Sequence, residues 1–236
     1  MTSLNLVAYE RIGLANPVSE AAIGDLLALS DLGEGDRAAE LGCGGAALAI
    51  LLAGHDLNVL AVDRGEAMAD LARRKVAAAG MANRIEVRAG EADVVAAGRG
   101  PFRLVAAMGT TGLGNFRMLS DLTEPGGWIL WGDIVWAEAP AVMPPGVSMD
   151  YDTDAGWRVR AAAAGLELAG FHASDDADWD AYVDRLKSAV LAWRAEVPDD
   201  PAGEAVEAHM RATAALYSPD NRRSLGFATY LFRKPG

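Results

Sequence analysis

Two acidic residues stand at or near the ends of apolar runs, and a glycine-rich turn follows the first of them. Glu40 lies two residues before the turn Gly42-Cys43-Gly44-Gly45, and a run of small residues follows. The second apolar run, 58–62, ends in Asp63. Glycines let a backbone approach a ligand closely, and a carboxylate can accept several hydrogen bonds at once. This layout is typical of a nucleotide-cofactor site at the ends of the first two strands of a parallel sheet.

The elements that position these residues are strands that alternate with helices. Such alternation predicts a doubly wound, Rossmann-like α/β sheet with helices on both faces. The almost continuously apolar run 128–135 predicts a strand buried on both faces. We expect helices over 19–32, 46–53, 65–79, 116–122, 154–164, 176–195 and 201–217, and strands over 37–41, 58–62, 85–87, 102–108, 128–135, 166–173 and 224–232, with turns or loops at 33–36, 109–115 and 125–127.

The length and composition indicate one globular domain. The chain has 236 residues, of which 51% are hydrophobic and 23% are charged. Within a single domain at 1–236 we expect an N-terminal helical segment at 1–35, a cofactor-binding core at 36–140 and a substrate-side portion at 141–236. A helical insert at about 176–217 precedes the last strand. We expect it to cover the carboxyl ends of the strands, where ligands bind in open α/β sheets.

Charge and cysteine content exclude several classes of protein. The net charge of −12 argues against a nucleic-acid partner, which requires a cationic surface. The single cysteine, Cys43, excludes an internal disulfide and a cysteine-based zinc site, so we predict no metal. The start of the chain does not resemble a signal peptide, and the longest apolar stretch, 46–53, is far shorter than the roughly 20 residues of a membrane helix. We therefore expect a cytoplasmic protein without a membrane partner, and the sequence does not indicate its oligomeric state.

The glycine turn is compatible with two classes of cofactor. Residues 42–47 match the dinucleotide fingerprint G-x-G-x-x-A. However, Glu40 would repel a pyrophosphate at the following helix N-terminus, whereas a cationic cofactor such as S-adenosylmethionine tolerates an acid there. The dinucleotide fingerprint also often opens its domain, and here a predicted helix precedes the first strand. An NAD-dependent oxidoreductase remains the alternative, but no Tyr-x-x-x-Lys pair supports it, since Tyr182 and Lys187 have the wrong spacing.

Segments along most of the chain resemble class I S-adenosylmethionine-dependent methyltransferases. Residues 38–45 resemble the first motif of that family, and Val62-Asp63 resembles the acidic end of its second strand. Gly90-Glu91-Ala92 is similar to the segment beside the adenine, and 122–127 is similar to the Leu-Lys-Pro-Gly-Gly turn with one extra residue. The resemblance implies a mostly parallel sheet with an antiparallel last strand, S-adenosylmethionine as cofactor and S-adenosylhomocysteine as product.

Other segments narrow the resemblance and also depart from it. Residues 16–20 and 225–227 are similar to a bacterial branch of small methyltransferases whose substrates are undefined. Arg103 stands where many relatives begin the fourth strand with an acidic residue. The loop 109–114 lacks the aromatic residue expected in that branch. Both departures concern the acceptor side more than the cofactor side.

The resemblance assigns cofactor contacts to individual residues. Asp63 is expected to bind the ribose hydroxyls, Glu40 the amino group and Glu91 the adenine amino group. Arg64 and Met68 are expected to flank the adenine, although Met68 also suits the core. The predicted cofactor-binding residues are Glu40, Gly42, Cys43, Gly44, Asp63, Arg64, Met68, Gly90, Glu91, Ala92, Met108 and Gly109.

The residues that act on the acceptor are less well defined by the sequence. Methyl transfer needs mainly alignment of the nucleophile, methyl carbon and sulfur in a dry site, so a general base is optional. Asp133 and Trp136, at and just after the end of the fifth strand, are the predicted catalytic residues, with a structural role as the alternative for each. Weaker candidates are His172, His209 and His55 as bases, and Tyr182, Trp193 and Tyr217 as pocket aromatics that equally suit a core. We expect methylation of a small molecule. A catalytically silent cofactor-binding protein is the third interpretation.

Overall fold

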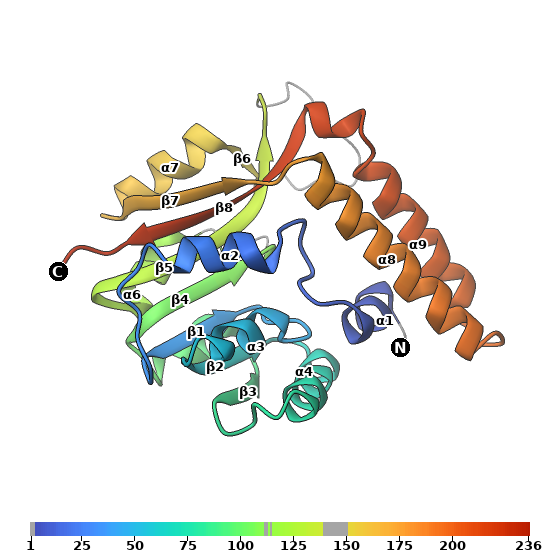
Figure 1. Ribbon diagram of the computed structural model, residues 1–236, viewed down its shortest axis with the longest axis horizontal. Coiled ribbons are helices and arrows are strands. Elements are labelled where there is room, and N and C mark those ends of the chain that lie inside the picture. The colour runs from blue at the N-terminus through green and yellow to red at the C-terminus, as the bar shows by residue number, and fades with distance from the viewer. Residues whose placement is uncertain (1–2, 111–112, 114, 139–150) are drawn as a thin grey trace.

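A mixed β-sheet forms the centre of the computed structural model, which describes residues 3–110, 113, 115–138 and 151–236. Its strands are β1 (Arg37–Leu41), β2 (Asn58–Asp63), β3 (Ile85–Ala89), β4 (Phe102–Met108), β5 (Thr123–Trp136), β6 (Asp152–Thr153), β7 (Glu167–Ala173) and β8 (Leu225–Arg233). The eight-stranded sheet has the order β3-β2-β1-β4-β5-β8-β7, and β6 pairs with β5 (Figure 1).

The strand directions confirm the predicted fold class. Strands β3, β2, β1, β4 and β5 pair in parallel with their neighbours. Strand β8 runs antiparallel to β5 on one side and to β7 on the other. The sheet is therefore mostly parallel with an antiparallel last strand. In this topology β1 is flanked by β2 and β4, and the carboxyl ends of the parallel strands lie at one edge.

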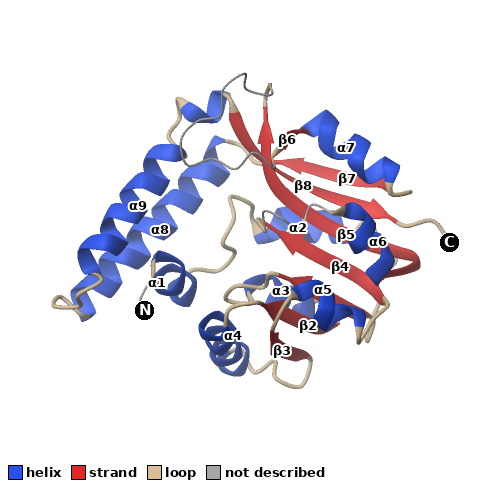
Figure 2. Ribbon diagram, turned by 180° about the vertical axis from the view of Figure 1, so that it is seen from behind, coloured by secondary structure: helices blue, strands red, loops and turns tan. Residues whose placement is uncertain are grey.

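Helices cover both faces of the sheet (Figures 1 and 2). They are α1 (Leu4–Arg11), α2 (Glu20–Leu27), α3 (Ala47–Gly54), α4 (Glu66–Ala78), α5 (Ala92–Ala97), α6 (Phe116–Leu122), α7 (Asp154–Ala163), α8 (Asp176–Glu196), α9 (Gly203–Leu216) and the short 3₁₀ helix η1 (Asn221–Arg223).

Alternate side chains of the strands divide the core into two clusters. In β5, Leu130 packs with residues of α1, α2, α3 and α8, whereas Ile129 and Trp131 pack with residues of α6 and α7 on the other face. Successive strand residues point to opposite faces, so a strand covered on both sides is apolar at nearly every position. This explains why the run 128–135 has no alternating pattern.

The predicted helix at 19–32 ends earlier than expected, at Leu27. Its start is as predicted, since the Ser19 side chain accepts a hydrogen bond from the Ala22 amide at 3.1 Å. At the other end, Ser30 Oγ donates to the Leu27 carbonyl at 2.5 Å. Asp31 Oδ1 then accepts hydrogen bonds from Arg103 and from Trp128 Nε1. Because Asp31 is bonded to the sheet, residues 28–32 do not continue the helix.

Arg103 itself lies at the amino-terminal end of β4, where it also donates to the Gly126 carbonyl at 2.7 Å. The predicted turn at 125–127 is included in β5, where the pairing with β4 shifts register between Phe102 and Leu104. Gly126 has φ +75°, and a Cβ on Gly127 would lie 2.9 Å from the Arg103 carbonyl oxygen. Residues 125–127 therefore pack closely against β4 instead of forming a separate turn. Arg103, which stands where many relatives have an acidic residue, lies at the opposite end of β4 from Met108.

Helices α8 and α9 form a long pair that projects beyond the sheet, with α1 beside them (Figure 1). A capping box begins α8, in which Asp175 and Asp178 each accept from the backbone amide of the other. Helices α1 and α5 and strand β6 were not predicted. Residues 111, 112 and 114 of the predicted glycine-rich loop lie outside the described residues. In the part of the chain that the structure describes, no helix has both the length and the apolar character needed to cross a membrane.

Candidate active site

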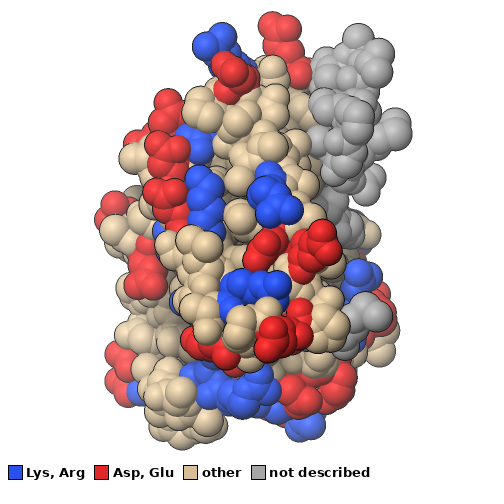
Figure 3. Space-filling view, turned by 90° about the vertical axis from the view of Figure 1, so that its right-hand side faces the viewer, with Lys and Arg blue, Asp and Glu red and all other residues tan. Residues whose placement is uncertain are grey.

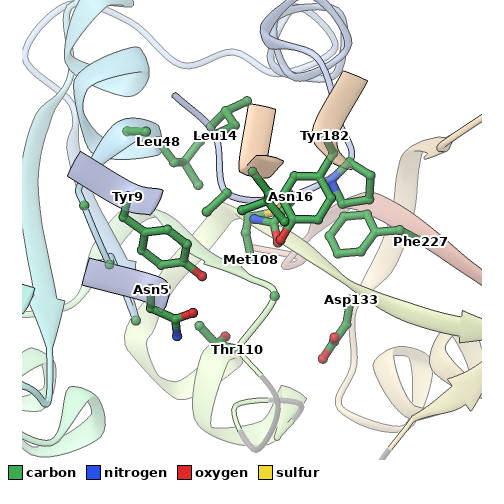
Figure 4. Close-up of a pocket in the computed structure, with 18 of the residues that line it drawn as sticks. Asn5, Tyr9, Leu14, Asn16, Leu48, Met108, Thr110, Asp133, Tyr182 and Phe227 are labelled. Carbon is green, nitrogen blue, oxygen red and sulfur yellow. The ribbon is translucent and has the colours of Figure 1, made fainter. Parts of the chain in front are cut away.

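A cavity of about 280 Å³ lies between the carboxyl ends of the parallel strands and helices α1, α8 and α9 (Figure 4). The strand ends contribute Glu40 from β1, Met108 from β4 and Asp133 from β5. The helical wall includes Tyr9 from α1 and Tyr182 from α8. Further lining residues include Asn5, Leu14, Asn16, Gly42, Cys43, Gly44, Leu48, Gly109, Thr110, Tyr151, Trp179, His209, Tyr217 and Phe227.

The glycine turn between β1 and α3 forms the floor of this cavity. Gly42 has φ +76° and Gly44 has φ +51°, a region of backbone conformation that favours glycine. A Cβ on Gly42 would overlap the methyl group of Thr110, and one on Gly44 would lie 3.1 Å from the Tyr9 ring. The glycines are therefore required both by the turn and by the side chains packed against it.

Asp63 lies directly beside the glycine turn because β1 and β2 pair in register, with Leu41 opposite Val62. Its carboxylate accepts hydrogen bonds from the Gly44 amide at 3.0 Å and from the Gly65 amide at 2.9 Å. A carboxylate has about four acceptor sites, so two amides leave capacity for a ligand. The two acidic residues singled out by the sequence thus meet at one edge of the sheet.

Glu40 is a buried carboxylate, with 5% of its surface exposed. Its Oε2 atom has no hydrogen-bond partner among the described residues. Burial raises the pKa of Glu40 to about 8, and the nearby Asp63 charge also raises it, whereas the Ala49 amide lowers it. A buried polar atom without a partner is costly and is uncommon in native proteins. The position therefore suits a ligand that brings a hydrogen-bond donor or a positive charge.

Cys43 is a free, buried cysteine in the same turn. Burial raises the pKa of its thiol, and the charges of Glu40 and Asp63 raise it further. A thiol kept protonated in this way is a poor nucleophile. Cys43 therefore contributes its backbone and its small volume to the turn.

Asp133 of β5 lines the cavity (Figure 4). Only 4% of its surface is exposed, and Oδ1 accepts a hydrogen bond from the Ile134 amide at 2.8 Å. Burial raises its pKa to about 6. At neutral pH this carboxylate is mostly ionised and can accept a proton from a bound molecule.

The structure does not bring Trp136 to the cavity, contrary to its prediction as a residue that faces the substrate. Trp136 is buried, and its ring lies 6.3 Å from the ring of Tyr151, which lines the cavity in its place. Among the histidines, only His209 lines the cavity. His172 lies 3.1 Å from Asp178, and His55 is the C-cap of α3.

The predicted adenosine contacts lie outside this cavity but close to Asp63. The Gly90 amide donates to the Asp63 carbonyl at 3.0 Å, so the turn that carries Glu91 and Ala92 adjoins the end of β2. Arg64 is exposed and Met68 is half-buried in the first turn of α4. Of the predicted pocket aromatics, Tyr182 and Tyr217 line the cavity, whereas Trp193 packs in the core.

Helix α1 supplies cavity-lining residues that the sequence motifs do not indicate. Asn5 and Tyr9 line the cavity, and the Tyr9 ring covers Gly44. The signal was present: Ser3 caps the helix by accepting from the Leu6 amide at 3.3 Å, and buried residues recur at helical spacing. The segment after α1 also contributes, because Asn16 packs against Gly109 so closely that a Cβ there would overlap its side-chain amide.

Lys75 of α4 binds the end of α1 close to the glycine turn. Its Nζ donates to the Tyr9 carbonyl at 2.5 Å and to the Ile12 carbonyl at 2.8 Å, and burial lowers its pKa. Lys75→Met should therefore lower the free energy of unfolding by roughly 1–3 kcal/mol, since both carbonyls lose a charged donor. Urea unfolding checks this, with the exposed Lys187→Met as control, for which we expect a change within about 0.5 kcal/mol. Equal effects of the two substitutions would contradict the role of Lys75.

Comparison with known proteins adds family and fold information to this geometry. Residues 38–127 match a family model described as a methyltransferase domain. An S-adenosylmethionine-dependent methyltransferase from Geobacter sulfurreducens, solved with S-adenosyl-L-homocysteine, is 20% identical, with a TM-score of 0.81 and 98% of each chain covered. A second from Thiobacillus denitrificans, solved with the same molecule, is 20% identical, with a TM-score of 0.79 and 98% of each chain covered. The E. coli protein YjhP is 21% identical, with a TM-score of 0.74 over 97% of this chain and 98% of that chain. No curated protein matches the sequence significantly.

The family match and the structural matches agree with the motifs. The matched range contains Glu40, the glycine turn and Asp63, and it ends before Asp133. Among the described residues, no group of three or more His, Cys, Asp or Glu is placed to hold a metal ion. The chain therefore carries a methyltransferase domain on the class I, S-adenosylmethionine-dependent methyltransferase fold.

Proposed function

We propose that this protein transfers the methyl group of S-adenosylmethionine to a small molecule held in the cavity, and that it does so in the cytoplasm. The observation that carries the proposal is the meeting of Glu40, the glycine turn and Asp63 at the carboxyl ends of β1 and β2. When bound, S-adenosylmethionine supplies a methyl group made electrophilic by a positively charged sulfur. The chain's own residues bind the reactants, align them and exclude water.

The residues present fit this cofactor. The unpartnered Oε2 atom of Glu40 suits the amino group, which is a cationic donor. Gly42 and Gly44 allow the backbone to approach the amino-acid end of the cofactor. Asp63 retains acceptor sites for the ribose hydroxyls, and Glu91, on the adjoining turn, is proposed to reach the adenine amino group.

The form of the cavity supports a small acceptor. Helices α1, α8 and α9 cover the strand ends from which the cavity is built, so a macromolecule would have to displace them. The net charge is −12. Figure 3 views the molecule from the side of α8 and α9, and it shows Lys and Arg interspersed with Asp and Glu on that side. A nucleic-acid acceptor would instead favour a continuous basic surface.

Thermal unfolding with three ligands tests the cofactor. At about a hundred times its dissociation constant, a ligand adds about 2.7 kcal/mol to the free energy of unfolding, which is roughly 5–10 °C for a chain of this size. We expect such shifts with S-adenosylhomocysteine and S-adenosylmethionine and none with NAD. A shift with NAD alone would overturn the proposal. Binding without product formation across a broad panel of acceptors would favour the catalytically silent alternative.

Asp63→Asn tests the ribose contact directly. The substitution removes the charge and keeps one acceptor oxygen, while its NH₂ group faces either the Gly44 or the Gly65 amide. Urea unfolding of the same variant therefore separates a change in the turn from loss of the ribose contact. Hydrogen bonds to charged groups contribute about 1.5–3 kcal/mol, and the dissociation constant of S-adenosylhomocysteine should therefore rise roughly 10–100-fold in titration calorimetry. Asp70→Asn, on the exposed side of α4, is the matched control. An unchanged dissociation constant for Asp63→Asn would remove Asp63 from the site.

A further inference from the structure

Aromatic rings gather on the helical side of the cavity. The ring centroids of Trp179 and Tyr217 lie 4.7 Å apart, and Tyr182 lies 6.4 Å from the first and 6.1 Å from the second. These three residues come from α8 and from the end of α9, and all of them line the cavity. Tyr151 and Phe227 also line the cavity, and Asp133 lies close enough for its charge to contribute to the raised pKa of Tyr217. Burial raises the pKa values of Tyr182 and Tyr217, so their hydroxyls stay neutral.

The charged groups that line this cavity are acidic. The described lining residues include the carboxylates of Glu40 and Asp133 and the imidazole of His209, but no Lys or Arg. Arg185 approaches from α8, with its guanidinium carbon 6.0 Å from the Tyr182 ring centroid, yet it is not a lining residue and donates to the Asn16 carbonyl. If Glu40 holds the cofactor's amino group, Asp133 is left as the acid beside the aromatic rings.

We propose that the methyl acceptor is an amine, which binds as a cation against Trp179, Tyr182 and Tyr217 with Asp133 as its counter-ion and proton acceptor. This inference rests on the proposed function and specifies its substrate class. Aromatic faces attract cations, most strongly where water is displaced. A buried charge is tolerated only when it is paired, and Asp133 supplies the pair. An anionic acceptor would instead meet two carboxylates, because Arg185 and Arg222, whose guanidinium carbons lie 6.0 Å and 5.9 Å from the ring centroids of Tyr182 and Trp179, are not among the lining residues.

Proton transfer also favours an amine over an alcohol. An alkyl ammonium group has a pKa near 10.4 in water, whereas a hydroxyl comparable to water has one near 15.7. The pKa of Asp133, about 6, is therefore much closer to that of the amine. A phenol has similar acidity to the amine, but it binds as a neutral molecule and so would leave the buried Asp133 carboxylate without a counter-ion. A deprotonated amine is neutral and ready to react.

The step balances with the residues and cofactor already named. One proton leaves the ammonium nitrogen for the carboxylate of Asp133 and from there passes to solvent. The freed lone pair of the nitrogen forms the new N–CH₃ bond. The electron pair of the broken C–S bond stays on sulfur, which gives S-adenosylhomocysteine. No oxidant, reductant or further co-reactant is required.

A matched pair of probes tests the cation preference. Choline and its carbon isostere 3,3-dimethyl-1-butanol have the same shape and differ in charge. Each is titrated into protein already saturated with S-adenosylhomocysteine, and that saturation is measured first. Failure to bind S-adenosylhomocysteine would count against the proposed function, whereas a failure in the second titration alone counts against the amine proposal.

We expect the wild-type protein to bind choline about tenfold or more tightly than the isostere. Asp133→Asn should bring the two dissociation constants to within about threefold, because it removes the charge and keeps the shape. Asp184→Asn, on the exposed side of α8, is the matched control and should keep the full preference. Tyr217→Leu provides a second variant and should also reduce the preference. Equal binding of the two probes, tighter binding of the isostere, or no binding of choline at its solubility limit would overturn the proposal.

Discussion

Replacing Glu40 by glutamine is expected to stabilise the protein without cofactor at alkaline pH while it weakens cofactor binding. The pKa of Glu40 is about 8 in the folded chain, compared with 4.5 for an ordinary glutamate. Between these values the folded state binds a proton that the unfolded state has released. The free energy of unfolding of the wild type therefore falls as pH rises from about 4.5 to 8 and is level above that.

The size of the effect follows from the same shift. At about 1.36 kcal/mol per pKa unit, ionisation of Glu40 costs the folded state about 5 kcal/mol above pH 8. Glutamine avoids that cost but adds an amide group without a partner, which costs about 1–3 kcal/mol. Urea unfolding at pH 9 should therefore show Glu40→Gln to be more stable than the wild type by roughly 2–4 kcal/mol. At pH 5 the advantage should be absent, and a difference that does not vary with pH would contradict the argument.

The same carboxylate should couple cofactor binding to proton release. At about pH 6.5 Glu40 is mostly protonated, and a cationic amino group placed beside it favours the ionised form. Titration calorimetry in two buffers of different ionisation enthalpy should therefore detect release of up to about one proton as S-adenosylmethionine binds to the wild type. Glu40→Gln should release none and should bind more weakly. Equal release by both proteins would assign the proton to another group.

Gly42→Ala is expected to abolish cofactor binding. The alanine would need a backbone conformation at φ +76°, which costs roughly 1–2 kcal/mol, and its Cβ would overlap the Thr110 methyl group. The turn must then shift, and the site between Glu40 and Asp63 shifts with it. We expect the thermal shift caused by S-adenosylhomocysteine to be lost and the free energy of unfolding to fall by roughly 2–4 kcal/mol.

Two further variants separate the causes of that effect. Adding Thr110→Ser removes the overlapping methyl group, so the double variant should regain part of the stability but keep the backbone strain. Gly54→Ala is the control, because Gly54 lies at the end of α3 with no heavy atom within 4 Å of its added Cβ. That control should be neutral or stabilising by up to about 1 kcal/mol. If Gly42→Ala behaves like Gly54→Ala, the turn is not the cofactor site.

The sequence alone determined the parts of the protein that depend on neighbouring residues. The turn after β1 requires glycine for its backbone, so the glycines in the sequence mark its position. Asp63 is brought to that turn by regular parallel pairing of two strands, which the apolar runs predicted. The alternation of the longer strands with helices followed from the same periodicity, whereas α1, α5 and β6 did not. For these reasons the fold class and the meeting of the glycine turn with Asp63 could be predicted from local patterns of residues.

The tertiary structure decided which side chains meet on the acceptor side. Tyr9, Asp133, Tyr182 and Tyr217 lie far apart in the sequence and share one cavity only because α1, α8 and α9 pack over the strand ends. Trp136 and Asp133 looked equivalent in the sequence, yet only Asp133 reaches the cavity. Local patterns report which residues are apolar or which turn needs glycine, but not which distant segment covers a strand end. That choice depends on side-chain packing between elements, and the acceptor site consists of such contacts.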